Sequence, residues 1–97
     1  MIEVQRTRDG DPLEFSVTVS DAGGRTRHDV TMDQATARRL AGGRSPERCL
    51  EAAFRFLLDR EPKESILRRF DVTVISRYFP EFESRLPEYL ARLDPGD

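Results

Sequence analysis

The sequence is poor in the residues that usually carry chemistry, with one cysteine, one histidine, one lysine and no tryptophan. The single cysteine, Cys49, excludes a disulfide within the chain, which predicts a protein of the reducing cytoplasm. A metal site needs three or four matched ligands, and one histidine and one cysteine among scattered carboxylates do not supply them. We therefore expect no metal and no cofactor.

Long apolar segments are also missing. No apolar run approaches the roughly 18 residues of a membrane span, so no membrane association is expected. The N-terminal stretch MIEVQRTRDGDP lacks the basic-then-apolar order of a signal peptide.

Nucleophilic catalysis would require a base beside Cys49 or beside a serine. Cys49 lies on a predicted helix next to Ala52, Ala53 and Phe56, where a free thiol behaves as a small hydrophobic side chain. His28 falls on a predicted strand, at the edge of its apolar face. A pairing of the two has no sequence signature, so the sequence predicts a protein that is not an enzyme.

Charged residues make up 35% of the 97-residue chain, but the net charge is only −2 because the two signs are mixed. Nearly all the basic residues are arginine, with Lys63 the exception. Arginine on this scale suits phosphate recognition or reflects coding bias, and the absence of clustering favours bias. The length and composition predict one domain, residues 1–97.

The first third of the chain, about residues 1–31, predicts strands. In LEFSVTVS, residues 13–20, apolar and polar side chains alternate without a fault, as in a strand with one dry and one wet face. RDGDP precedes this segment and DAGG follows it, and both are typical turn sequences. We predict a three-stranded antiparallel meander.

The rest, about residues 32–93, predicts four or five short helices that cover the meander in an α+β fold, with a frayed tail at 94–97. Thr31 to Gln34 fits a capping box with Thr31 as the N-cap, and Ser45-Pro46 fits a second helix start. Pro62 is expected to open a short helix that continues through Phe70. Glu-to-Arg pairs four residues apart support these helices; they are Glu51/Arg55, Glu64/Arg68, Glu81/Arg85 and Glu88/Arg92.

Residues 72–76 are ambiguous. Val72, Thr73, Val74 and Ile75 favour a strand by propensity, whereas Asp71 is a good N-cap and the apolar spacing to Phe79 is helical. We predict a helix, with a strand as the alternative. Pro80 would start the final helical segment, which Pro87 is expected to kink or divide.

The order of RTRHDVT, MDQATARRLAG, GRSPE and ERCLEAAFRFLLDRE over residues 25–61 resembles that of ribbon-helix-helix regulators and antitoxins. This resemblance implies a DNA-binding dimer in which Arg25, Arg27 and Asp29 face the bases. It also implies that the helix start at Ser45 meets a phosphate. DNA binding is therefore the alternative function.

A second segment, SPERCLEAAFRFLLDREPKESILRRFDVTVISRYFPEF at residues 45–82, resembles a group of small uncharacterised bacterial proteins. That resemblance implies a compact bacterial module and no established activity.

Seven of the eight aromatic residues lie between Phe54 and Tyr89. The dry face of the meander must be covered, so most of them are expected in the core. Short helices cannot bury every side, and four aromatics with two neighbouring arginines are expected to form a surface for a protein partner or a second copy. These residues are Phe56, Arg77, Tyr78, Phe82, Arg85 and Tyr89. The sequence thus predicts a small cytoplasmic protein-interaction or regulatory module.

Overall fold

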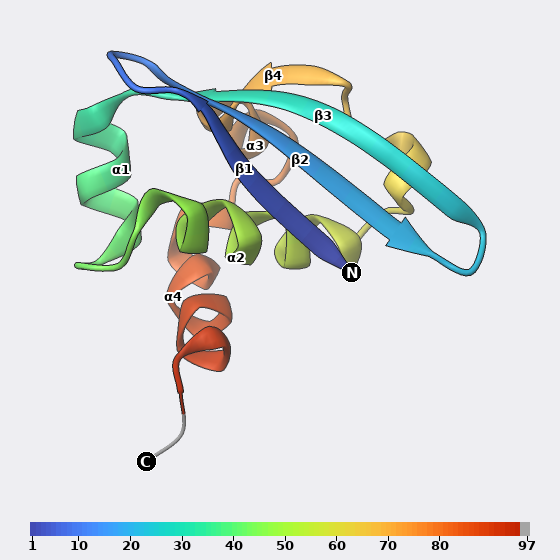
Figure 1. Cartoon of the computed structure of the whole chain (residues 1–97). Coiled ribbons are helices and arrows are strands. Elements are labelled where there is room, and N and C mark those ends of the chain that lie inside the picture. The colour runs from blue at the N-terminus through green and yellow to red at the C-terminus, as the bar shows by residue number, and fades with distance from the viewer. Residues whose placement is uncertain (96–97) are drawn as a thin grey trace.

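The computed structural model describes residues 1–95 and shows an α+β fold built on one four-stranded sheet (Figure 1). The strands lie in the order β1-β2-β3-β4. The first three are antiparallel, and β4 runs parallel to β3. Their bounds are β1 Ile2–Arg8, β2 Leu13–Asp21, β3 Gly24–Met32 and β4 Arg69–Asp71.

The alternation in β2 sets which face of the sheet is covered. Phe15 and Val17 are 1% and 0% exposed, while the alternating Ser16 and Thr18 keep partial contact with solvent. The turn that follows is closed by the pairing of Asp21 with Gly24. Gly24 adopts φ 123°, in the region that glycine reaches without steric cost. The antiparallel meander predicted from the sequence is confirmed.

In the described residues four α-helices follow the meander: α1 Gln34–Ala41, α2 Pro46–Leu58, α3 Ile75–Tyr78 and α4 Phe82–Leu93. Ser45 caps α2 as expected, and its hydroxyl accepts a hydrogen bond from the Arg48 amide. The cap of α1 is Asp33, so the prediction of Thr31 is wrong. Thr31 still belongs to β3, and its hydroxyl donates to the Asp71 carboxylate of β4 at 2.7 Å.

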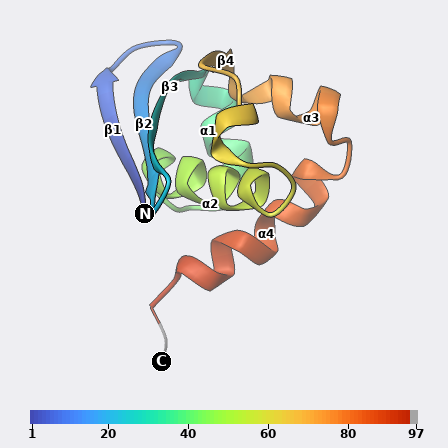
Figure 2. The same ribbon diagram turned by 90° about the vertical axis from the view of Figure 1, so that its right-hand side faces the viewer.

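The helix α2 forms the middle layer of the molecule. It packs against β1 on one side and against α4 on the other, and two views at right angles show it between the sheet and α4 (Figures 1 and 2). The buried hydrophobic residues of all these elements form one cluster. Among residues 1–95, no helix is long and apolar enough to cross a membrane.

The segment after α2 differs most from the sequence prediction. A helix from Pro62 through Phe70 was expected, but only a short 3₁₀ turn at Lys63–Ser65 forms. The chain then extends and adds β4 to the sheet, with Phe70 opposite Val30 and with the Asp29 amide donating to the Arg68 carbonyl at 2.8 Å. Pairing with β3 satisfies backbone groups that would otherwise lie unpaired at the sheet edge.

The ambiguous residues are helical, as predicted. A second 3₁₀ turn, Val72–Val74, leads directly into α3, and the Asp71 side chain accepts a hydrogen bond from the Thr73 amide. The expected division at Pro87 does not occur, because α4 continues through this residue. Of the predicted tail, Asp94 binds Arg44 at 2.6 Å, and residues 96–97 lie outside the described residues.

Candidate functional site: an apolar pocket beside Glu61 and Tyr78

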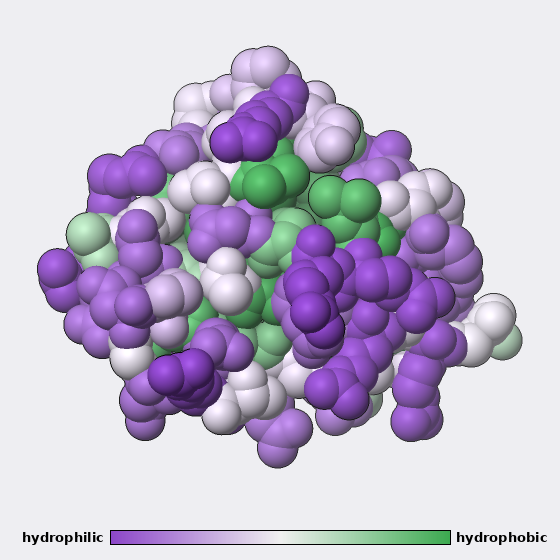
Figure 3. Space-filling model, turned by 90° about the horizontal axis from the view of Figure 1, so that it is seen from above, coloured by the Kyte–Doolittle hydropathy of each residue, from purple (hydrophilic) through white to green (hydrophobic). Residues whose placement is uncertain are grey.

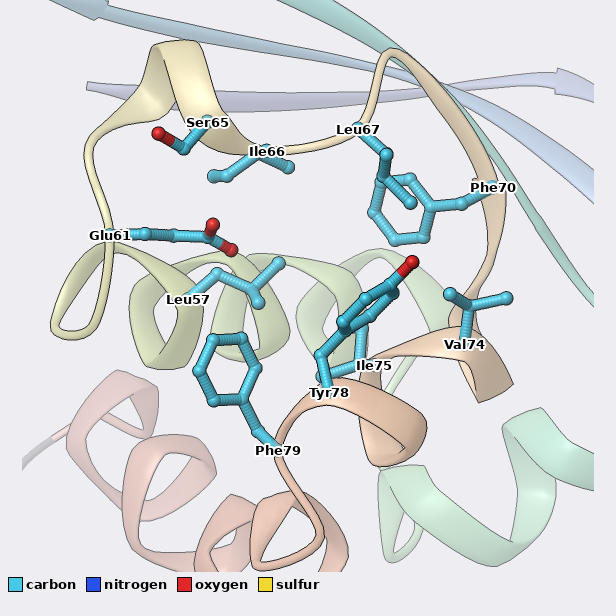
Figure 4. Close-up of a pocket in the computed structure, with 10 residues that line it drawn as sticks. All are labelled: Leu57, Glu61, Ser65, Ile66, Leu67, Phe70, Val74, Ile75, Tyr78 and Phe79. Atoms are coloured by element: carbon cyan, nitrogen blue, oxygen red, sulfur yellow. The ribbon is translucent and has the colours of Figure 1, made fainter.

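A pocket of about 180 Å³ opens between the C-terminal end of α2, the extended segment before β4, and α3 (Figure 4). Most of its lining is apolar. The lining residues are Leu57, Glu61, Ser65, Ile66, Leu67, Phe70, Val74, Ile75, Tyr78 and Phe79.

The pocket has a buried floor and an exposed apolar rim. Leu57, Ile66 and Ile75 are each less than 5% exposed and belong to the core. Tyr78 is 67% exposed and Leu67 is 46% exposed. Exposed large apolar side chains at the mouth of an apolar concave site are compatible with a binding surface.

Glu61 contributes the only carboxylate of the lining. Its backbone amide donates to the Leu57 carbonyl at 2.9 Å, which ties it to the last turn of α2. Figure 4 shows its side chain pointing into the pocket from one side, with the Tyr78 ring on the other. Burial raises the pKa of Glu61 above its ordinary value, and within residues 1–95 this carboxylate has no ion-pair partner.

His28 holds the rim in place from the sheet. Its Nδ1 lies 2.7 Å from the Leu67 carbonyl oxygen, and its Nε2 lies 2.8 Å from the Thr26 hydroxyl. Because a carbonyl can only accept, Nδ1 carries the hydrogen and Nε2 accepts from Thr26. Burial lowers the pKa of His28, so the ring is neutral at pH 7. The histidine is fully buried rather than at the edge of the apolar face, and it fastens Leu67 to β3.

Lys63 holds the other end of the same segment. Its side chain is only 4% exposed, and its Nζ lies 2.8 Å from the Asp21 carboxylate and 2.6 Å from that of Glu64. These two bonds raise the pKa of Lys63. Since Asp21 ends β2, the segment that forms one wall of the pocket is fixed to the sheet at both ends. The wall is therefore preorganised.

The expected aromatic surface is not present in the predicted form. Phe56, Phe82 and Tyr89 are 0%, 1% and 5% exposed, so the prediction that they are surplus to the core is wrong. The ring of Phe56 packs edge-on against those of Phe82 and Tyr89, with centroids 5.1 and 5.7 Å apart. The physical reason is that α4 packs across the side of α2 that faces away from the sheet, which buries both helices.

Of the predicted partner-binding residues, only Tyr78 lines the pocket, and exposed Arg77 precedes it on α3. Arg85 instead lies on α4 and pairs with Glu88 at 3.2 Å. The sequence prediction missed Glu61, Ser65 and Leu67. In an extended chain, adjacent side chains point in opposite directions. If residues 66–67 had been predicted as extended, burial of Ile66 would have indicated an exposed Leu67.

Of the residues of the DNA-binding alternative, Arg25, Arg27 and Asp29 lie on the outer face of the sheet and Ser45 lies at the start of α2. Figure 3 views the molecule from above, where hydrophilic residues surround a group of hydrophobic residues in the middle of that face. Arg25 and Arg27 are exposed, but Asp29 lies between Arg27 and Arg69, 3.5 and 3.7 Å from their guanidinium groups. β3 pairs with β2 along its whole length and with β4 at residues 29–31. β3 is therefore already paired within one subunit along one whole side and over residues 29–31 of the other, and Ser45 caps its own helix.

The remaining candidates for chemistry are not arranged for it. Cys49 is fully buried, and burial raises its pKa to about 11, so the reactive thiolate is disfavoured. Both ring nitrogens of His28 are already bonded. Over the described part of the chain, no group of three or more His, Cys, Asp or Glu side chains is placed to hold a metal ion.

Comparisons with known proteins add no further constraint. No family model, no curated protein and no solved structure matches the chain.

Proposed function

We propose that this chain is a small, non-enzymatic cytoplasmic module that binds a protein partner through the pocket bounded by Leu67 and Tyr78. The observation that supports this proposal is the exposure of these two large apolar side chains at the rim of a preorganised apolar pocket. A projecting side chain of the partner would enter the pocket, and the rim residues would pack around its backbone. Central apolar anchors of this kind supply most of the affinity in protein interfaces.

The test is a selection of random peptides on the immobilised protein, followed by binding measurements with the selected peptides. Tyr78→Ser and Leu67→Ser are expected to abolish binding of most selected peptides. Tyr78 is 67% exposed, so its substitution should change the free energy of unfolding by about 0.5 kcal/mol or less, whereas Leu67 is 46% exposed and its substitution should cost about 1 kcal/mol. Thermal melting of each variant checks this.

Ala91→Ser is the matched control, because it replaces an exposed apolar residue on α4, away from the pocket lining. It should leave peptide binding unchanged. Selected peptides whose binding is indifferent to both rim substitutions would refute the proposal. Sedimentation velocity over a range of concentrations tests whether the partner is a second copy of this chain. If it is, the wild-type protein should self-associate, and the two rim variants should self-associate more weakly.

A further inference from the structure

We infer that the partner residue received by the pocket is an arginine, held between the Glu61 carboxylate and the Tyr78 ring. This inference depends on the proposed function, because it specifies which side chain occupies the same site. The pocket contains one negative charge, an apolar floor for an aliphatic stem, and an exposed aromatic ring at its mouth.

Charge complementarity provides the first argument. Glu61 is partly buried among apolar side chains and finds no cation among the described residues, although the chain carries fifteen arginines. Partial burial among apolar side chains makes the charged form of the Glu61 carboxylate energetically unfavourable. A cationic side chain of the partner would offset this cost. The raised pKa of Glu61 agrees with this cost. A neutral apolar side chain would increase the penalty by displacing the remaining water.

The choice of arginine rests on geometry that the protein already uses elsewhere. The Arg60 guanidinium lies 3.6 Å from the centroid of the Phe56 ring, and its Nε is 3.1 Å from the Glu81 carboxylate. That arrangement combines an aromatic face with a carboxylate, and the pocket likewise has the Glu61 carboxylate on one side and the Tyr78 ring on the other (Figure 4). The planar guanidinium can stack on a ring and bond a carboxylate with two N–H groups at once, whereas an ammonium group cannot.

The experiment uses three small probes with the intact protein: the N-acetyl amides of arginine, citrulline and norleucine. Citrulline has nearly the shape of arginine without the charge, and norleucine has only the stem. Binding is followed by the amide chemical shifts of residues 61–79 in titrations at low ionic strength. We expect the arginine amide to bind about tenfold more tightly than the citrulline amide, the factor of one charge-assisted hydrogen bond.

Glu61→Gln should bring arginine and citrulline to equal affinity, and Tyr78→Ser should weaken both. Glu3→Gln is the matched control, since it removes an exposed carboxylate from β1, outside the pocket lining, and should preserve the preference. Equal binding of all three amides, a preference that survives Glu61→Gln, or no binding at all would overturn the inference. If selected peptides bind through the rim but carry no arginine preference, the inference fails while the proposed function stands. If no peptide depends on the rim, the proposed function fails.

Discussion

The aromatic cluster around Phe56 gives the sharpest test of the packing described above. Replacing Phe56 or Phe82 by alanine should cost about 3–5 kcal/mol each, which approaches the whole stability of many small domains. Leucine is therefore the better substitution, because it retains part of the buried volume. Each leucine variant is expected to be destabilised but folded.

The magnitude of interest is the coupling between the two rings. Their centroids are 5.1 Å apart with planes inclined at 63°, an edge-to-face arrangement. Such pairs contribute about 0.5–1.5 kcal/mol beyond the area they bury. The double variant Phe56→Leu/Phe82→Leu should thus lose less stability than the sum of the single losses, by an amount in this range.

Urea denaturation followed by circular dichroism measures all four free energies of the cycle. Phe15→Leu with Phe82→Leu is the control pair, since Phe15 lies on the sheet and α2 separates the sheet from α4. Those losses should add within about 0.3–0.5 kcal/mol. If the Phe56/Phe82 cycle is equally additive, the two rings do not pack as described, and Phe82 is again available to a partner.

Two further predictions concern the residues that fix the pocket wall. Burial lowers the pKa of His28 below its ordinary 6.5, so protonation of His28 favours the unfolded state. The contribution of the neutral ring to the free energy of unfolding is complete above about pH 6.5 and is lost as the pH drops through the folded-state pKa. Melting temperatures measured between about pH 7.5 and 5.5 should show this decline. The variant His28→Gln, although less stable, should show a much smaller decline. If the melting temperature falls equally steeply with pH in both proteins, His28 is not the source of the decline. Lys63→Met should lower the melting temperature by a few degrees. It should also speed hydrogen exchange of the Gly23 amide, because this N–H is bonded to the same Asp21 carboxylate as Lys63. Unchanged exchange at Gly23 would show that Lys63 does not stabilise the turn. The pKa of Lys63 is raised, so its contribution should persist at neutral pH and be lost above about pH 10.5.

The fold was predictable where the signal is local. The alternation from Leu13 to Ser20 and the Ser45-Pro46 helix start need only neighbouring residues, and both predictions are confirmed. The strand β4 has only three residues, and what makes it a strand is pairing with β3, some forty positions earlier in the chain. No local pattern contains that information, so a helix through Phe70 was the wrong but natural prediction.

The site was less predictable than the fold, for a related reason. Of four Glu-to-Arg helix pairs expected, Glu51/Arg55 forms, whereas Glu81 binds Arg60, just after α2, and Glu64 binds Lys63. Which carboxylate stays without a cation depends on how distant segments meet, and sequence spacing cannot single out Glu61. Tyr78 was predicted at a surface because short helices cannot bury every aromatic side chain. The same reasoning was applied to Phe56 and Phe82, which the packing of α4 on α2 buries.

The enclosure of Lys63 has a chemical consequence. The sequence carries a single lysine, so it offers one ε-amino group, and that group is enclosed by Asp21 and Glu64. Acylating reagents and acetyltransferases attack the neutral, accessible amine, and both the raised pKa and the enclosure oppose this. Lys63 should therefore be modified only when the segment that carries it separates from the turn after β2. The rate at which an amine reagent labels this residue would measure how often that wall of the pocket opens in the native protein.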